Sequence, residues 1–158
     1  MSYDRIFNEM RSLIKNCPDG IMVTCDGDMY NWNCFISGPE GTSYETLVYE
    51  IEVIFRKCHP FKPPMIRFVT PIFHPNVSPD GSIWISLLHE RWSPALTMKS
   101  ILMILRSILD DPEVDEDAED AEDAEDHIHI VNKDAYNLWI SDKDLYKKYV
   151  KIWYDGLE

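Results

Sequence analysis

The first residues of the chain repeat apolar side chains with the period of a helix. Ile6, Met10, Leu13 and Ile14 recur at helical spacing within residues 3–16, and Phe7 widens the apolar stripe. A Cys-Pro-Asp-Gly sequence at 17–20 then stops the pattern. The sequence therefore predicts an amphipathic N-terminal helix that buries this stripe.

Four strand-like segments follow, at 21–24, 30–36, 47–55 and 65–69. In the second and third of them apolar residues alternate with polar ones, so one face is expected to be buried and the other solvated. A Gly-Pro-Glu-Gly turn at 38–41 and a proline-rich extended linker at 59–64 separate segments. This order predicts a four-stranded antiparallel meander.

Residues 71–95 have no strong period, and so long an irregular stretch in a compact domain is usually functional. Thr97 is then placed to cap a long central helix, which should end at the Asp-Asp-Pro sequence at 110–112. The apolar face of this helix is expected to consist of Met98, Ile101, Leu102, Leu105, Ile108 and Leu109, with Ile104 broadening it.

Two C-terminal helices are expected after residue 131. The first spans 132–140 and the second carries Leu145, Tyr149, Ile152 and Trp153 on one face. A capping box at 141–144 would begin the second helix, and Gly156 fits the position just past its end. The whole pattern predicts one α+β domain over residues 1–158, with the helices on one face of the sheet.

The net charge of −13 comes largely from one low-complexity segment. Residues 113–126 hold ten of the 28 acidic residues, which leaves 18 acidic against 15 basic residues elsewhere. We expect a solvated loop there, since crowded like charges disfavour a helix. The alternative is a segment that attracts a basic partner. No basic face suggests a nucleic-acid partner.

The composition indicates a soluble, intracellular protein, cytoplasmic or nuclear. The chain has 158 residues, 45% of them apolar, with no membrane-spanning run and no signal-peptide pattern at the N-terminus. Its four cysteines form no C-x-x-C pair, so we expect free thiols rather than a thiol-bound metal or a disulfide framework. We expect neither a metal nor a cofactor, because a metal on His127 and His129 is less expected than chance placement.

Four motifs occur in a specific order: Pro-Phe-Lys-Pro-Pro at 60–64, His-Pro-Asn at 74–76, Asp-Gly-Ser-Ile at 80–83 and Trp-Ser-Pro-Ala at 92–95. Together they resemble the active-site region of a ubiquitin-conjugating enzyme. In that family a cysteine some eight residues after His-Pro-Asn carries ubiquitin as a thioester. Here that position is Trp84. The resemblance covers nearly the whole chain and implies the family's fold.

The resemblance assigns roles to the residues around Trp84. Asn76 would stabilise the negative oxygen that develops when a lysine amine attacks the thioester, or would only hydrogen-bond backbone in a turn. His74 is expected to hold the loop through its ring nitrogens rather than act as a base. Ser86 occupies a position that tunes the approach of lysine in the family. Trp84 itself offers one N–H donor and no nucleophile.

The resemblance also implies binding surfaces. Phe61, Pro94 and Ala95 match the apolar patch that binds RING or HECT ubiquitin ligases. Arg5 and Arg11 persist from the basic cluster on the first helix that docks the activating enzyme, although acidic residues intervene. The expected partners are therefore ubiquitin or a ubiquitin-like modifier, a ligase, and an activating enzyme or an active conjugating enzyme.

Two main hypotheses follow. In the first, the chain is a non-catalytic variant that binds these partners without forming a thioester. In the second, it is an active enzyme whose natural residue 84 is cysteine, because the residues on both sides of Trp84 remain family-like. An unrelated α+β binding domain would require the motif order to be coincidence.

Overall fold

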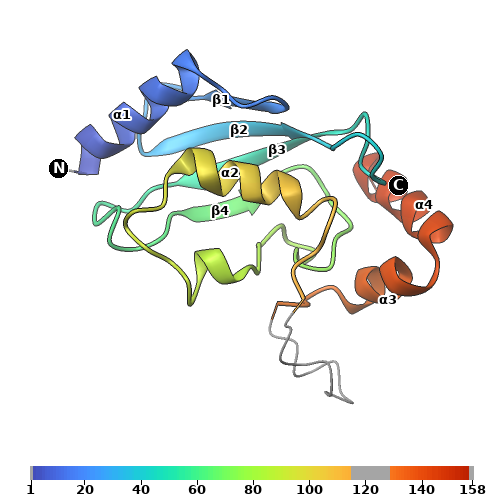
Figure 1. Cartoon of the computed structure of the whole chain (residues 1–158). Helices are drawn as coiled ribbons and strands as arrows, with labels where there is room; N and C mark the ends of the chain where they lie inside the picture. The colour runs from blue at the N-terminus through green and yellow to red at the C-terminus, as the bar shows by residue number, and fades with distance from the viewer. Residues whose placement is uncertain (1, 115–128, 157–158) are drawn as a thin grey trace.

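A computed structural model describes residues 2–114 and 129–156 (Figure 1). The elements run in the order α1 (Ser2–Lys15), β1 (Ile21–Thr24), β2 (Asn31–Ser37), β3 (Val48–Ile54), β4 (Met65–Phe68), the short 3₁₀ helix η1 (Ser86–Leu88), α2 (Met98–Ser107), α3 (Lys133–Ser141) and α4 (Lys143–Tyr154). This succession confirms the predicted α+β fold. None of the helices in this part of the chain is long and apolar enough to cross a membrane.

The sheet is the predicted antiparallel meander, with strand order β1-β2-β3-β4. Cys34 pairs with Ile51, and Ile51 pairs with Phe68, so these buried side chains stand side by side across three strands. Because successive side chains in a strand point to opposite faces, this register gathers the apolar positions on one face.

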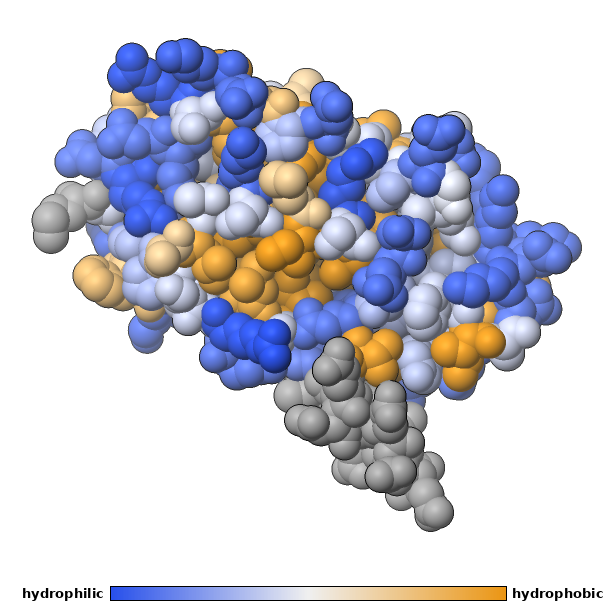
Figure 2. All heavy atoms as spheres, in the orientation of Figure 1, coloured by the Kyte–Doolittle hydropathy of each residue, from blue (hydrophilic) through white to orange (hydrophobic). Residues whose placement is uncertain are grey.

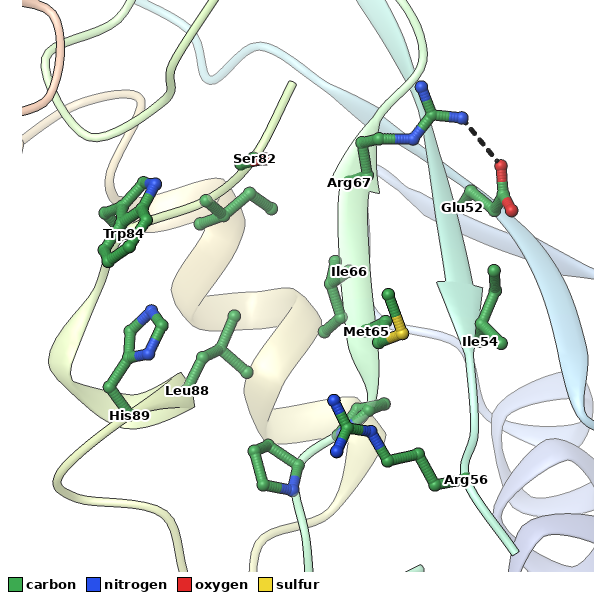
Figure 3. Close-up of a pocket in the computed structure, with 13 residues that line it drawn as sticks. Glu52, Ile54, Arg56, Met65, Ile66, Arg67, Ser82, Trp84, Leu88 and His89 are labelled. Atoms are coloured by element: carbon green, nitrogen blue, oxygen red, sulfur yellow. Dashed lines mark hydrogen bonds and ion pairs between the residues drawn. The ribbon is translucent and has the colours of Figure 1, made fainter. Parts of the chain in front are cut away.

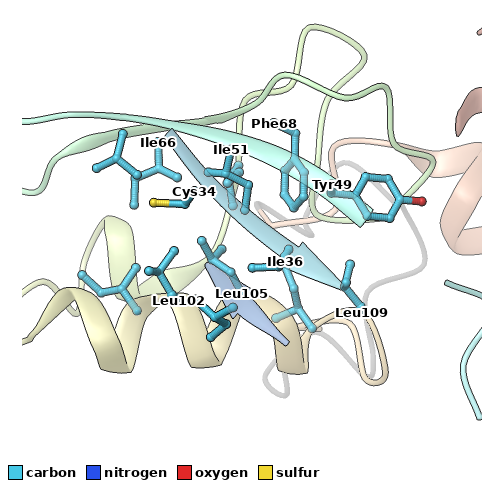
Figure 4. Close-up of a cluster of buried hydrophobic side chains, with 14 of the residues drawn as sticks. Cys34, Ile36, Tyr49, Ile51, Ile66, Phe68, Leu102, Leu105 and Leu109 are labelled. Atoms are coloured by element: carbon cyan, nitrogen blue, oxygen red, sulfur yellow. The ribbon is translucent and has the colours of Figure 1, made fainter. Parts of the chain in front are cut away.

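The core lies between that face and α2 (Figure 4). Leu102, Leu105 and Leu109 project from the helical side toward Ile36 and Ile51 of the sheet, and all five are buried. Thr97 caps α2 as predicted: its hydroxyl accepts the Ser100 N–H, and the Ser100 hydroxyl accepts the Thr97 N–H. The strand and helix periods thus identify the two halves of the core.

The outer side of α2 is not uniformly polar. Met103 is exposed and Ile104 is half-buried. Figure 2 shows the same side of the molecule, where an apolar area over the middle of the face is rimmed by hydrophilic residues. Apolar residues scattered on a surface are normal, so exposure alone assigns this area no role.

The buried stripe of α1 is narrower than predicted. Ile6, Met10 and Leu13 are buried, but Ile14 is 69% exposed and Phe7 is 41% exposed. The expected burial of Ile14 and Phe7 is therefore wrong. Leu13 already fills the inward position of that turn, and Ile14 lies about 100° further round the helix, facing solvent.

The predictions for α4 also need correction. Asp142, not Ser141, caps the helix by accepting the Leu145 N–H, and Ser141 is the last residue of α3. Tyr146 and Val150 are the buried residues, whereas Leu145, Tyr149 and Ile152 are exposed. Gly156 has the positive φ expected just past a helix end.

The buried side of α4 differs from the predicted one because of where the helix packs. Figure 1 shows α3 and α4 beyond the end of the sheet rather than over its face, which contradicts the predicted placement of all helices on one face. There the hydroxyl of Tyr146 hydrogen-bonds that of Tyr44, and the ring centroids of Tyr154 and Tyr49 lie 5.3 Å apart. These contacts select the buried side of α4, and a local helical period does not encode them.

Candidate functional site

The irregular segment 71–95 is fixed against the edge of the sheet. Arg67 and Ser82 form an antiparallel bridge, and the Phe68 N–H donates to the Gly81 carbonyl at 2.9 Å. Gly81 has φ of +92°, and a Cβ there would lie 2.2 Å from the Phe68 oxygen. Only glycine therefore allows this close approach of the two backbones.

His74 holds the segment from inside. It is fully buried, its Nδ1 accepts the Asn76 N–H at 3.0 Å, and its Nε2 lies 2.6 Å from the Ile108 carbonyl oxygen. Since Nδ1 accepts, the proton belongs on Nε2, which donates to that carbonyl. Burial lowers the pKa of His74 to about 4. A neutral ring of this kind positions backbone, and both of its nitrogens are engaged.

Asn76 ties together the two ends of the acidic segment. Its buried side-chain Nδ2 donates to the carbonyls of Glu113 at 2.8 Å and His129 at 2.9 Å, and its Oδ1 accepts the Glu113 N–H at 2.8 Å. Both amide hydrogens are thus engaged with backbone. The oxyanion role of Asn76 stays a prediction that requires the amide to leave these partners.

Trp84 stands at the surface of this segment. Its backbone N–H donates to the Asn76 carbonyl at 2.8 Å, its side chain is 41% exposed, and its ring stacks on that of His89 with centroids 5.1 Å apart. The indole is therefore accessible, but it carries no group that could attack a thioester.

None of the four cysteines lines the cavity beside Trp84. Cys34 is buried in β2, where desolvation raises its pKa to about 12. The thiols of Cys17 and Cys25 donate to nearby carbonyls, and Cys58 is exposed in the turn after β3. Within the described residues there is also no group of three or more ligating side chains that could hold a metal.

Comparison with known proteins agrees with the motifs and the fold. The sequence model described as "Ubiquitin-conjugating enzyme" matches residues 5–154. The chain belongs to the ubiquitin-conjugating enzyme family. Ubiquitin-conjugating enzyme E2-18 kDa of Schizosaccharomyces pombe is 32% identical over 166 aligned positions, which cover 96% of this chain and 92% of that protein.

In this ubiquitin-conjugating enzyme fold, Glu113, the first residue of the acidic segment, lies beside the segment that carries Trp84. The Ser86 N–H donates to a Glu113 carboxylate oxygen at 3.0 Å, and the same oxygen lies 4.0 Å from Nε2 of His129. His129 Nε2 also contacts Glu90 at 2.9 Å. No local pattern predicts these contacts of Glu113 and Glu90, because they join segments far apart in the chain. The loop was predicted for residues 113–126; apart from Glu113 and Val114 these residues lie outside the described part of the chain, as does His127.

The residues predicted to bind a ligase lie on two neighbouring loops. Phe61 is 74% exposed, so it does not pack under the linker, and Pro94 and Ala95 are exposed as well. The Trp92 indole N–H donates to the Pro60 carbonyl at 3.1 Å and holds the two loops together. The arrangement offers an apolar surface of the kind the family resemblance implies.

The two arginines expected to meet the activating enzyme differ in their surroundings. Arg5 donates to the carbonyls of Pro94 at 3.0 Å and Leu96 at 3.1 Å, and it pairs with Glu9. Arg11 is exposed on the same helix. Arg5 therefore supports the loop that carries Pro94 and Ala95, whereas Arg11 is available at the surface.

A cavity of about 360 Å³ lies on the sheet side of Trp84 (Figure 3). Trp84 and His89 form one wall, and Ile54, Met65 and Ile66 lie across from them. Arg56 and Arg67 also line the cavity, and Arg67 pairs with Glu52 at 3.0 Å. Of the lining residues, Pro63, Pro64, Ser82, Ile83 and Trp84 belong to the active-site motifs or to the expected site, whereas the side chains of β3 and β4 were not expected there from the sequence.

Proposed function

We propose that this member of the ubiquitin-conjugating enzyme family binds partners of the ubiquitin pathway without carrying ubiquitin as a thioester. The observation that supports the proposal is Trp84 at the position of the family's cysteine. Transfer of ubiquitin between thioesters requires a thiolate that attacks the carbonyl carbon while the first thiolate leaves. Indole cannot form that bond. A reducible ubiquitin adduct on the unaltered chain would contradict the proposal.

The position of the Trp84 ring supports the same function. The ring stacks on that of His89 in the wall of the cavity, at the position where the family carries its cysteine. An exposed aromatic ring there occupies space that an extended ubiquitin tail would need. On this proposal the chain lacks the nucleophile, and the Trp84 ring also blocks the path of the ubiquitin tail to position 84.

One observation favours the second candidate, an active enzyme whose natural residue 84 is cysteine. The network below Trp84 is intact, since His74, Asn76 and the backbone of Trp84 are all joined by hydrogen bonds. The same network would hold this loop in an active enzyme with cysteine at position 84. The codon for residue 84 in the source gene decides between tryptophan and cysteine directly.

The proposed partners include a ubiquitin ligase of RING or HECT type, held through Phe61, Pro94 and Ala95. Phe61→Ala should weaken binding to such a domain by about 30-fold, because an exposed aromatic anchor in an interface often contributes 2 kcal/mol or more. Calorimetric titration against a panel of RING and HECT domains measures this. Met103→Ala, which also truncates an exposed apolar side chain but on the outer side of α2, is the matched control. Equal affinities of the Phe61→Ala protein and the parent for every domain that binds would contradict this assignment.

A further inference from the structure

The cavity beside Trp84 combines an apolar interior with basic groups. Ile54 and Met65 are 37% and 55% exposed, and they face the aromatic wall formed by Trp84 and His89 (Figure 3). Its volume of about 360 Å³ is at the small end of the range for ligand sites, and suits one large side chain with its neighbours. The lining therefore favours an apolar side chain in the interior.

The charged residues that line the cavity determine which charge the ligand should carry beside its apolar side chain. Arg67 is held by Glu52 at 3.0 Å, whereas Arg56 is exposed and makes no ion pair with any residue that the structure describes. The cavity is thus lined by two arginines against one glutamate, on a chain with a net charge of −13. This local excess of positive charge complements an acidic group and disfavours a basic one.

The backbone beside the cavity favours an extended ligand. β4 is one of the two edge strands of the sheet, and its second half is covered by the bridge from Arg67 to Ser82 and the hydrogen bond from Phe68 to Gly81. Its first half, Met65 and Ile66, forms no such bridge with the described segment 71–95, and it borders the cavity as Arg67 does. A sheet edge presents backbone groups with which an added extended chain can pair.

We propose that this cavity binds an extended segment of a partner protein in which a large apolar side chain, flanked by acidic residues, enters between Trp84 and β4. The apolar side chain would contact Met65 and Ile54, and an acidic neighbour would pair with Arg56. The inference rests on the proposed function, because it describes a partner held at the position of the missing nucleophile.

The test uses a fluorescein-labelled nine-residue peptide with a central phenylalanine, an aspartate on each side of it, and glycine and serine elsewhere. Fluorescence polarisation with the full chain should give saturable binding with Kd below about 1 mM. Arg56→Glu and Met65→Glu should each weaken binding by about tenfold or more. Lys148→Glu and Met103→Glu, which make the same charge reversal and the same apolar-to-acidic change at exposed positions outside the cavity, should alter Kd by less than about twofold.

Several results would overturn the inference. One is the absence of saturable binding; another is equal binding by the Arg56→Glu and parent proteins. Equal binding of a peptide with alanine in place of the phenylalanine would show a site for anions alone. If sedimentation shows that Arg56→Glu separates a dimer into monomers, the occupant is a second copy of this chain and the proposed ligand is wrong.

Ubiquitin charging of the same preparations separates this inference from the proposed function. A chain that binds the peptide yet forms a reducible ubiquitin adduct contradicts only the proposed function. A chain that stays uncharged and does not bind the peptide contradicts only the inference about the cavity.

Discussion

Replacing Asn76 with alanine should lower the free energy of unfolding by about 3–5 kcal/mol. The side chain makes three hydrogen bonds of 2.8 to 2.9 Å with the backbone of Glu113 and His129. Its loss leaves these backbone groups without that partner in an enclosed site, and each such group costs about 1–3 kcal/mol. Urea unfolding at pH 7 measures the change.

Two further variants determine which atoms of Asn76 matter. Asn76→Asp keeps an acceptor for the Glu113 N–H but turns an oxygen toward two carbonyls, so it should be at least as destabilising as alanine. Asn8→Ala, an exposed position on α1, should change stability by less than about 0.5 kcal/mol. If Asn76→Ala unfolds at the same urea concentration as the parent chain, the amide does not hold the ends of the acidic segment.

The chain should lose stability steeply as the pH falls from about 6.5 to 4, because two histidines are buried in the neutral form. Burial lowers the pKa of both His59 and His74 from 6.5 to about 4. A lowered folded-state pKa means that the unfolded chain takes up the proton first. The full stabilisation is therefore present above pH 6.5, and about 3 kcal/mol per histidine is lost by pH 4.

His59 is the better residue for isolating this effect. It is 2% exposed, and the centroid of its ring lies 4.8 Å from that of Phe55. Neither ring nitrogen of His59 has a hydrogen-bond partner among the described residues. His59→Phe should therefore flatten the pH dependence, losing about 3 kcal/mol less than the parent between pH 7 and pH 4.

Urea unfolding at half-unit pH steps compares the two curves, with Asn8→Ala running parallel to the parent. Parallel curves for His59→Phe and the parent would show that protonation of His59 does not cause the loss.

The fold could be predicted from sequence where a single period determines the structure. Alternation predicted β2 and β3, and the 3.6-residue period predicted α1 and α2 within one or two residues. Burial at Ile14 and along α4 could not be predicted in this way. In both cases two adjacent positions fit an apolar stripe, and distant contacts such as Tyr44 with Tyr146 decide which of them turns inward.

The candidate site divides in the same manner. Motif order placed His74, Asn76 and Trp84 in one segment, and the structure joins them by hydrogen bonds. The partners of Asn76 are 37 and 53 residues away in the chain, and no local pattern connects them. The cavity depends equally on tertiary structure, because β3, β4 and the Trp84 segment each supply part of its wall.

The most direct measurement is a charging assay on the unaltered chain, Trp84→Cys and Trp84→Ala. Each is incubated with activating enzyme, ubiquitin and ATP, then resolved on non-reducing gels and by intact mass. We predict a thiol-reducible ubiquitin adduct on Trp84→Cys alone, because Trp84→Ala removes the bulk of the ring without supplying a nucleophile. A reducible adduct on the unaltered chain would contradict the absence of thioester chemistry. The absence of an adduct from all three proteins would contradict the prediction for Trp84→Cys and would show that a second feature of the chain prevents charging.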